Sequence, residues 1–235
     1  MKEKTSQPND HWIPAAQEFF LHLPADVPML ERWKDFLLWT AYQAAEPRKH
    51  DPQAEITARY GRYSKVLFSQ IFRILCLAVA ENPHQNALLK LCQALHLTGA
   101  YTYDESAAER LLSVQLANHA EAIGSISLKD SNCASTRGSA LIALANVVKR
   151  SYPKNYQEKA IFIAAGSSDG YSHLISYIQL SIMGMPAYVL QDDVQIDDYS
   201  ELGLFIPENA ICTPEFFSDA WMKARWKAVV KAATK

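Results

Sequence analysis

The stretch that decides the fold runs from Ala160 to Asp193 and reads AIFIAAGSSDGYSHLISYIQLSIMGMPAYVLQDD. It contains a short apolar run, Ile161 to Ala165, then a polar break, then a segment with apolar residues at helical spacing, and finally a second apolar run, Ala187 to Leu190. The two runs are too short for helices, so the stretch predicts a strand, a tight loop, a helix and a second strand. Such a βαβ unit indicates a parallel sheet in the second half of the chain.

A similar pattern precedes this stretch. Ile123 to Leu128 predicts a further strand and Thr136 to Lys149 a helix, which extends the order to strand, helix, strand, helix, strand. Thr213 and Pro214 then open a final helix. We therefore expect an α/β protein with a helical N-terminal half, followed by a small parallel-sheet βαβαβ half that ends in a terminal helix.

The first 120 residues predict helices and no strand. The expected helices are Pro14 to His22, Val27 to Ala45, Glu55 to Glu81, Gln85 to Leu97 and Glu105 to His119. Six of the eight glycines lie between Gly124 and Gly203, so residues that permit turns are concentrated in the second half of the chain. The sequence pattern changes from helical to mixed helix and strand near residue 121. We expect a disordered tail over residues 1–10, a helical region over 11–120 and an α/β region over 121–235. A single continuous fold is the alternative.

Composition narrows the classes of function. The chain has 235 residues, of which 49% are hydrophobic, and a formal net charge of −2. This charge disfavours general nucleic-acid binding. The four cysteines form no C-x-x-C pair and no zinc-ligand spacing, which is typical of reduced thiols in the cytoplasm. No secretory signal and no apolar segment of about twenty residues is evident, so we expect a soluble cytoplasmic protein without a membrane span.

Three loops of this predicted sheet carry groups that suit an anion. In a parallel sheet the segments after Leu128, Ala165 and Leu190 leave from the same carboxyl edge, where open α/β sheets bind ligands. Two of the loops open helices, whose free N–H groups attract anions, and the third supplies carboxylates that could hold Mg²⁺. The sequence predicts a small phosphate-bearing or nucleotide-like ligand there, although caps and turns alone explain the same residues. The expected binding residues are Ser135, Thr136, Gly138, Gly166, Ser167, Ser168, Gly170, Asp192 and Asp193.

Catalysis is left open by the sequence. Ser168 fits the G-x-S-x-G pattern of the nucleophile elbow of the α/β-hydrolases, but His173 is the only histidine that follows it. A triad in the order of that family therefore cannot be completed. Cys133, in a serine-rich loop, is a second weak candidate for a nucleophile. Whether the protein is an enzyme stays uncertain.

A protein partner is the alternative to a small ligand. Leu38 and Trp39 lie off the main apolar stripe of the helix from Val27 to Ala45. Either this helix is buried on two sides, or Trp39 belongs to an exposed docking face, because aromatic residues are enriched in interface cores. The second interpretation predicts a non-catalytic adaptor or accessory subunit that docks through its tryptophan-rich helical half.

Overall fold

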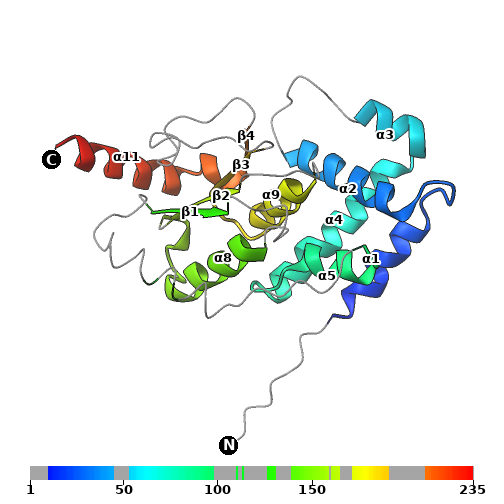
Figure 1. The fold of residues 1–235 in the computed structure, drawn as a ribbon, viewed down its shortest axis with the longest axis horizontal. Helices are drawn as coiled ribbons and strands as arrows, with labels where there is room; N and C mark the ends of the chain where they lie inside the picture. Colours follow the sequence, from blue (N-terminus) through cyan, green and yellow to red (C-terminus); the bar gives the residue numbers. More distant parts are fainter. Residues whose placement is uncertain are drawn as a thin grey trace, which may run out of the picture.

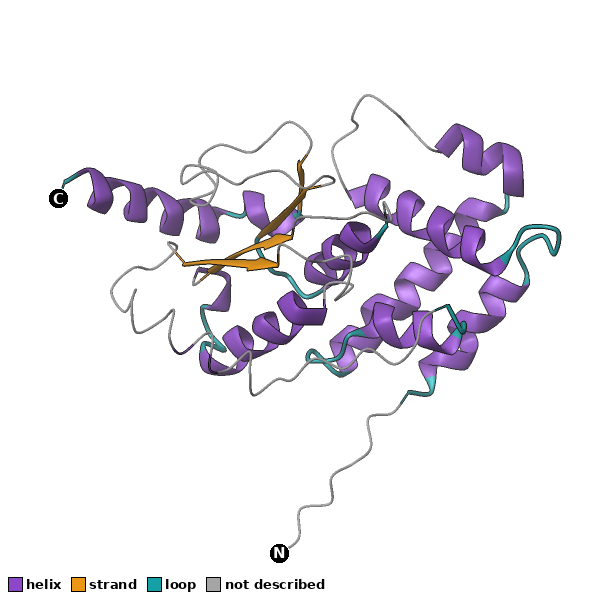
Figure 2. Ribbon diagram, in the orientation of Figure 1, coloured by secondary structure: helices purple, strands orange, loops and turns teal. Residues whose placement is uncertain are grey.

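A computed structural model describes residues 10–44, 53–97, 110, 113, 126–130, 139–158, 160–164, 171–190 and 210–234. Most of these residues lie in helices. Four strands form one sheet, which lies between a group of N-terminal helices and the C-terminal helix (Figure 1, Figure 2). The predicted tail, apart from residue 10, lies outside the described residues.

The N-terminal helices pack around a shared aromatic core. Phe36 lies at its centre, with ring centroids 5.5 Å from Phe20, 5.8 Å from Trp33 and 5.9 Å from Phe68. All four side chains are buried, and aromatic pairs at such separations add stability beyond the area that they bury. The helices are α1 (Trp12–Leu21), α2 (Met29–Ala44), α3 (Gln53–Tyr60), α4 (Ser64–Glu81) and α5 (Ala87–Ala94).

The single helix predicted from Glu55 to Glu81 is wrong, because Gly61 divides it into α3 and α4. The φ angle of Gly61 is +73°, a left-handed conformation that ends a helix and that glycine adopts without a steric penalty. Before the break, α3 packs against α2. The buried Asp35 of α2 accepts hydrogen bonds from Tyr60, at 2.6 Å, and from Arg59.

The sheet has the strand order β1-β2-β3-β4, which is also the chain order. β1 (Ile126–Asp130), β2 (Ala160–Ala164) and β3 (Ala187–Leu190) are parallel neighbours. The crossover helices α8 (Ser139–Ser151) and α9 (Ser172–Ile182) connect them and pack against each other. Each strand is added on the same side of the one before it, and right-handed crossovers then place both helices on the same face of the sheet. On its other side, α9 contacts α2 and α5, so it forms the layer between the sheet and the N-terminal helices.

The opposite face of the sheet carries the C-terminal segment. β4 (Ala210–Cys212) pairs with β3 in antiparallel fashion and leads through a 3₁₀ turn, η2 (Pro214–Phe217), to α11 (Asp219–Ala233). Side chains alternate along β3: Ala187 and Val189 belong to the main core, whereas Tyr188 and Leu190 pack with Trp221 and its neighbours. A second 3₁₀ turn, η1 (Tyr156–Glu158), also contacts α11.

The predicted fold class is therefore corrected. The prediction of a small parallel-sheet βαβαβ half with a terminal helix is wrong, because the sheet is mixed: its last strand runs antiparallel to β3. Helices dominate both halves of the described chain, and strands are short. The physical reason is the length of the connection between β3 and β4, which allows β4 to run either parallel or antiparallel to β3. The apolar runs alone therefore do not set its direction.

Buried amides join the N-terminal helices to the C-terminal half. Gln179 of α9 donates to the backbone carbonyl of Gln85 at 3.1 Å and accepts from the N–H of Leu88 at 3.2 Å. Asn146 of α8 donates to the carbonyl of His84 at 2.7 Å. One hydrophobic cluster also includes residues from both halves. The boundary predicted near residue 121 lies outside the described residues.

Candidate functional site

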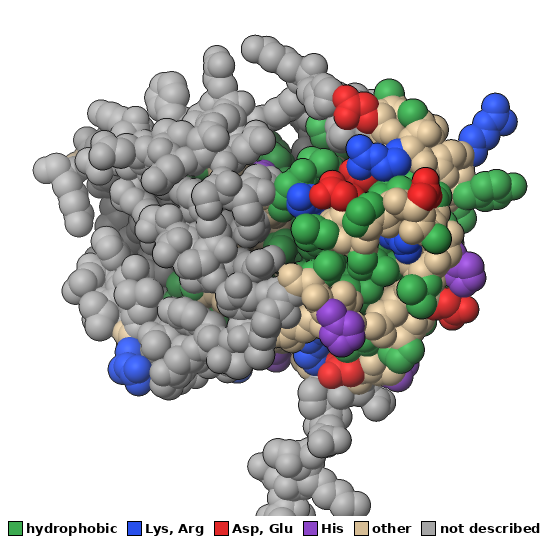
Figure 3. Space-filling model, turned by 45° about the vertical axis from the view of Figure 1, so that its right-hand side comes forward, with side chains coloured by type: hydrophobic (Ala, Val, Ile, Leu, Met, Phe, Trp, Pro, Cys, Tyr) green, Lys and Arg blue, Asp and Glu red, His purple; other side chains and the backbone are tan. Residues whose placement is uncertain are grey.

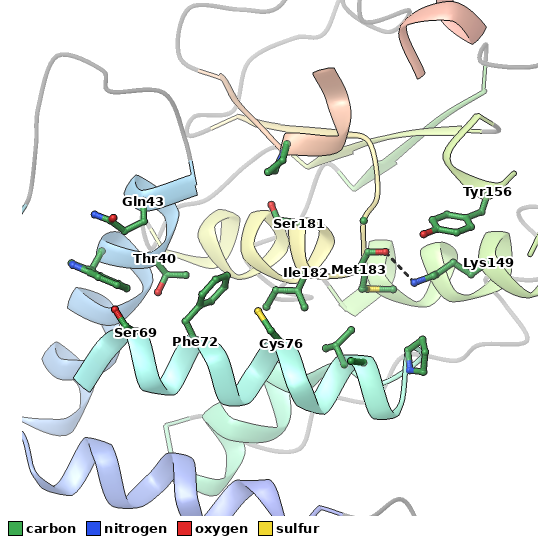
Figure 4. A pocket seen from close by; sticks show the side chains of 16 residues that line it. Thr40, Gln43, Ser69, Phe72, Cys76, Lys149, Tyr156, Ser181, Ile182 and Met183 are labelled. Carbon is green, nitrogen blue, oxygen red and sulfur yellow. Dashed lines mark hydrogen bonds between the residues drawn. The ribbon is translucent and has the colours of Figure 1, made fainter. Parts of the chain in front are cut away.

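A cavity of about 800 Å³ lies where α2 and α4 meet the end of α9 (Figure 4). Small-molecule sites in proteins commonly measure about 300–1,000 Å³, so this cavity has the size of a ligand pocket. Its wall is mainly apolar, with polar groups at its two ends. The lining residues are Trp39, Thr40, Gln43, Ser69, Phe72, Cys76, Val79, Ala80, Pro83, Lys149, Tyr156, Ser181, Ile182, Met183, Gly184 and Pro214.

One stripe of α4 forms the floor of this cavity. Ser69, Phe72, Cys76 and Val79 recur at the three- and four-residue spacing that places side chains on one helix face. Figure 4 shows Ser69, Phe72 and Cys76 pointing from α4 toward α9. From Ser69 to Ala80 the stripe extends for about 16 Å, at the helical rise of 1.5 Å per residue. The cavity is therefore elongated along α4.

Lys149 and Tyr156 line one end of the cavity. The Lys149 ammonium donates to the carbonyl oxygen of Met183 at 3.0 Å and lies 5.0 Å from the centroid of the Tyr156 ring. The ion pairs formed among the described residues do not include Lys149. Burial lowers the pKa of this ammonium, because a desolvated charge is disfavoured. Burial and the negative charge of Glu215 raise the pKa of Tyr156.

The opposite end carries polar groups of α2. The Trp39 indole N–H and the Thr40 hydroxyl are both buried, and neither has a hydrogen-bond partner among the described residues. Buried polar atoms are almost always paired, so two unpaired ones in adjacent residues are unusual. Both residues belong to the cavity wall.

Gly184 shapes the wall beside Lys149. Its φ angle is +68°, and it directly follows the last turn of α9. A Cβ at this position would lie 3.4 Å from the Tyr156 hydroxyl oxygen and 3.6 Å from the Gln157 amide nitrogen. Both the backbone conformation and the close approach of η1 therefore favour glycine here.

Cys76 is the one cysteine among the described residues that line this cavity. Its side chain is half-buried, and burial raises the pKa of the thiol. A raised pKa leaves little thiolate at neutral pH, so the thiol is a weak nucleophile. Cys76 therefore serves the cavity as a small apolar wall residue.

The sequence analysis predicted a ligand site at the carboxyl edge of the sheet. The strand register places Asp130 beside Ala164 and Ala164 beside Val189, so the carboxyl ends of these strands lie at one edge of the sheet. Open α/β sheets usually bind ligands in a crevice at the point where the strand order reverses. The strand order does not reverse between β1 and β3. The predicted residues Cys133, Ser135, Thr136, Gly138, Gly166, Ser167, Ser168, Gly170, Asp192 and Asp193 all lie outside the described residues. Their roles in phosphate binding, in Mg²⁺ binding and in catalysis stay predictions.

Trp39, the predicted docking residue, is buried rather than exposed. Only 6% of it is accessible, and its ring lies 5.8 Å from that of Phe68. The interpretation of α2 as a helix buried on two sides is the one that agrees with the structure, because α2 packs on α4 and also on α9. Trp39 contributes to a cavity wall and not to an exposed docking face.

The sequence analysis missed the residues that surround this cavity. Ser69, Phe72 and Cys76 have the spacing of ordinary core positions, so their pattern does not distinguish a core from a cavity. Lys149 offered one signal: it follows Ile142 and Ala145 by seven and four positions, on a face of α8 that is otherwise buried. A lysine in register with an apolar stripe is a sign of a partly buried charge.

Other classes of site find little support in the part of the chain that is described. No group of three or more His, Cys, Asp or Glu residues there could hold a metal ion. The face of the N-terminal helices in Figure 3 mixes basic, acidic and hydrophobic side chains. No single described helix is both long and apolar enough to cross a membrane; only residues Ala54–Tyr60 taken together with α4 pass such a test, with a bend of 103° between them.

Comparisons of this chain with protein-family models, with curated proteins and with solved structures found no match.

Proposed function

We propose that this protein binds a small amphipathic anion in the cavity between α2, α4 and α9. The ligand has an elongated apolar body and one carboxylate or phosphate head. The observation that carries this proposal is the position of Lys149: a half-buried ammonium, without a carboxylate partner among the described residues, at one end of a mainly apolar cavity.

The chemistry of the ammonium supports an anionic head group. A lysine ammonium has three N–H donors, and the Met183 carbonyl accepts only one of them. The π face of Tyr156 offers a weak second interaction. Glu215 is close enough to influence Tyr156 but forms no ion pair with Lys149 among the described residues. An anion at this end would pair with the ammonium directly, and charge-assisted hydrogen bonds are among the strongest in proteins.

The shape of the cavity supports the apolar body. Phe72, Val79 and Ile182 line the space between its two polar ends. Removing apolar surface from water contributes about 25 cal/mol per Å², so an elongated chain laid along α4 would gain most of its affinity there. The head group would then determine the direction in which the ligand enters.

A pair of matched probes tests the proposal. Dodecanoate and dodecanol share an apolar chain and differ only in the charge of the head. We expect the wild-type protein to bind dodecanoate more tightly, by roughly 10- to 100-fold, the range expected of a hydrogen bond to a charged group. Lys149→Met should remove this preference and leave dodecanol binding nearly unchanged. Isothermal titration calorimetry measures both affinities, and Cys76 alkylation, followed by peptide mass spectrometry, should slow when either probe binds.

Lys154→Met is the control, because Lys154 is an exposed lysine outside the cavity wall. It should not alter the preference for dodecanoate. Because the pKa of Lys149 is lowered, the dodecanoate preference should also decline as the pH rises toward the ordinary lysine value of about 10.4. Equal binding of both probes, or equal effects of the two lysine variants, would contradict the proposed role of Lys149.

A further inference from the structure

The C-terminal helix α11 has apolar side chains on two different faces. Trp221 and Ala224 are buried against the rest of the molecule. Met222, Trp226 and Val230 follow one another at four-residue spacing and are 41%, 68% and 46% exposed. Residues four apart lie on one helix face, so these three side chains form a second stripe. We call them the outer stripe of α11.

The outer stripe has no covering among the described elements. α11 contacts η1 and η2 through its buried face, and it extends away from the sheet to the edge of the molecule (Figure 1). Phe217 of η2, 58% exposed, adds a further apolar side chain near the start of the helix. An exposed apolar group of this kind on a single element commonly marks an interaction site.

Positive charge lies beside this stripe. Lys223 follows Met222 by one position and Lys227 follows Trp226 by one position, which places each lysine about 100° around the helix from its apolar neighbour. Both lysines are exposed and form no ion pair within the described part of the chain. Asp219 is the one acidic residue of α11, whose sequence also holds Arg225 and Lys231. The helix therefore presents an apolar stripe beside two lysines, Lys223 and Lys227, that form no ion pair among the described residues.

We propose that the outer stripe of α11 lies on an anionic lipid surface. Interfacial helices combine tryptophan and aliphatic residues on one face with lysines beside them, and they bind by apolar burial together with attraction to anionic lipids. Tryptophan prefers the level of the lipid head groups, and lysine side chains extend back toward the charged surface. The proposal does not rest on the proposed ligand of the cavity.

The area of the stripe argues against a protein partner. A specific protein interface buries about 800 Å² on each partner, whereas even a tryptophan contributes only about 150–250 Å². Three partly exposed side chains and Phe217 do not reach that area. A lipid surface needs no complementary pocket, because acyl chains adapt to the side chains that enter them.

Trp226 supplies a direct readout in the full-length protein. The other four tryptophans, Trp12, Trp33, Trp39 and Trp221, are at most 6% exposed, so quenching by acrylamide reports mainly on Trp226. Vesicles of phosphatidylcholine with phosphatidylserine should protect this tryptophan from acrylamide and shift its emission to shorter wavelength. Phosphatidylcholine alone should do so much less, and added salt should reverse the effect.

Variants test the two contributions separately. Trp226→Ser should weaken sedimentation with anionic vesicles by about tenfold or more, from the apolar surface lost. Lys223→Glu with Lys227→Glu should weaken it by at least about twentyfold, from the loss of attraction to the surface potential. The control is Tyr63→Ser with Lys65→Glu, which replaces one aromatic residue by serine and reverses one lysine charge, at an 80% exposed tyrosine and an exposed lysine near the start of α4. It should leave sedimentation unchanged.

Three results would overturn the proposal. The first is a wild-type protein that does not sediment with anionic vesicles at low salt. The second is a control variant that weakens sedimentation as much as Trp226→Ser does. The third is a Trp226 that is already protected from acrylamide without lipid, in a protein whose mass by light scattering is that of a dimer, since a second copy would then cover the stripe.

Discussion

At the scale of single residues, Asp35, Arg59 and Tyr60 form a connected polar group in which two donors share one carboxylate. Asp35 is 6% exposed and accepts from both partners. A buried carboxylate is costly unless it is paired, so α3 must supply these donors to α2. Burial and the negative charge of Asp35 together raise the pKa of the Tyr60 hydroxyl far above 10.

The raised pKa of Tyr60 predicts a loss of stability in alkali. The unfolded chain releases the Tyr60 proton near pH 10, before the folded protein does, so the stability that the hydroxyl contributes is complete below pH 10 and is lost as the pH rises above it. Tyr60→Phe should cost about 1.5–3 kcal/mol at pH 8 and should unfold with a shallower alkaline decline than the wild type. Urea denaturation at a series of pH values measures both effects.

Tyr63→Phe is the matched control, since this ring is 80% exposed and lies three positions away. It should alter neither the stability at pH 8 nor its decline in alkali. If Tyr60→Phe declines as steeply as the wild type, the alkaline loss arises elsewhere, with Tyr156 as the first candidate because its pKa is also raised.

At the scale of elements, the break between α3 and α4 depends on one backbone conformation. A Cβ at Gly61 would meet nothing within 4 Å, whereas one at Gly184 would meet Tyr156. Gly61→Ala should therefore destabilise the protein by about 1–2 kcal/mol through the left-handed φ alone. Gly61→Asn should recover part of this loss, since asparagine tolerates that conformation.

Gly184 provides the comparison. There, asparagine should recover little, because its longer side chain would meet the Tyr156 hydroxyl and the Gln157 amide. Thermal denaturation of Gly61→Ala, Gly61→Asn, Gly184→Ala and Gly184→Asn separates the two causes. Equal recovery by asparagine at both positions would mean that the close approach of η1 to Gly184 has no energetic weight.

The elements show what local patterns can predict. The apolar run from Ala187 to Leu190 coincides with β3, and the predicted helix after Tyr171 agrees with α9, because a short apolar run and a helical period are local signals. Gly61 was not recognised as a break, since the apolar residues on both sides of it keep a helical spacing. β4 was also missed, because three residues contain no periodicity, and its direction depends on a partner that is distant in sequence.

At the scale of the whole molecule, Gln179 connects the two halves. Gln179→Met preserves side-chain size but leaves the buried Leu88 N–H and Gln85 carbonyl without their partner. Each such group costs about 1–3 kcal/mol, so we expect a loss of about 2–5 kcal/mol in the free energy of unfolding. Unfolding followed by both circular dichroism and tryptophan fluorescence would show separate transitions if the two halves no longer unfold cooperatively.

Gln17→Met is the control, because the Gln17 amide makes a single, partly buried hydrogen bond to the Ala94 carbonyl, within the N-terminal helices. It should cost about 1 kcal/mol and leave unfolding in one transition. Equal losses from both variants would show that the amide of Gln179 is not a special connection between the halves.

The cavity illustrates why a site can escape sequence analysis. Its wall combines residues from α2, α4, α8 and α9, and this combination exists only once α9 packs between the sheet and the N-terminal helices. Glycines, serines and aspartates, by contrast, stand out in a sequence wherever they cluster, which directed the predicted site to the loops. An apolar cavity has the composition of a core, and only the packing distinguishes the two.

The antiparallel strand β4 has a consequence for how the protein avoids aggregation. An exposed sheet edge can recruit a strand from another chain, and proteins blunt such edges with very short strands and with proline. β4 has three residues, and Pro214, which has no N–H to donate, begins the next turn. The Thr213 hydroxyl donates to the Met185 carbonyl and accepts from the Ala187 N–H, which holds the chain at this point. A strand from another molecule would find too few free groups here to form a ladder.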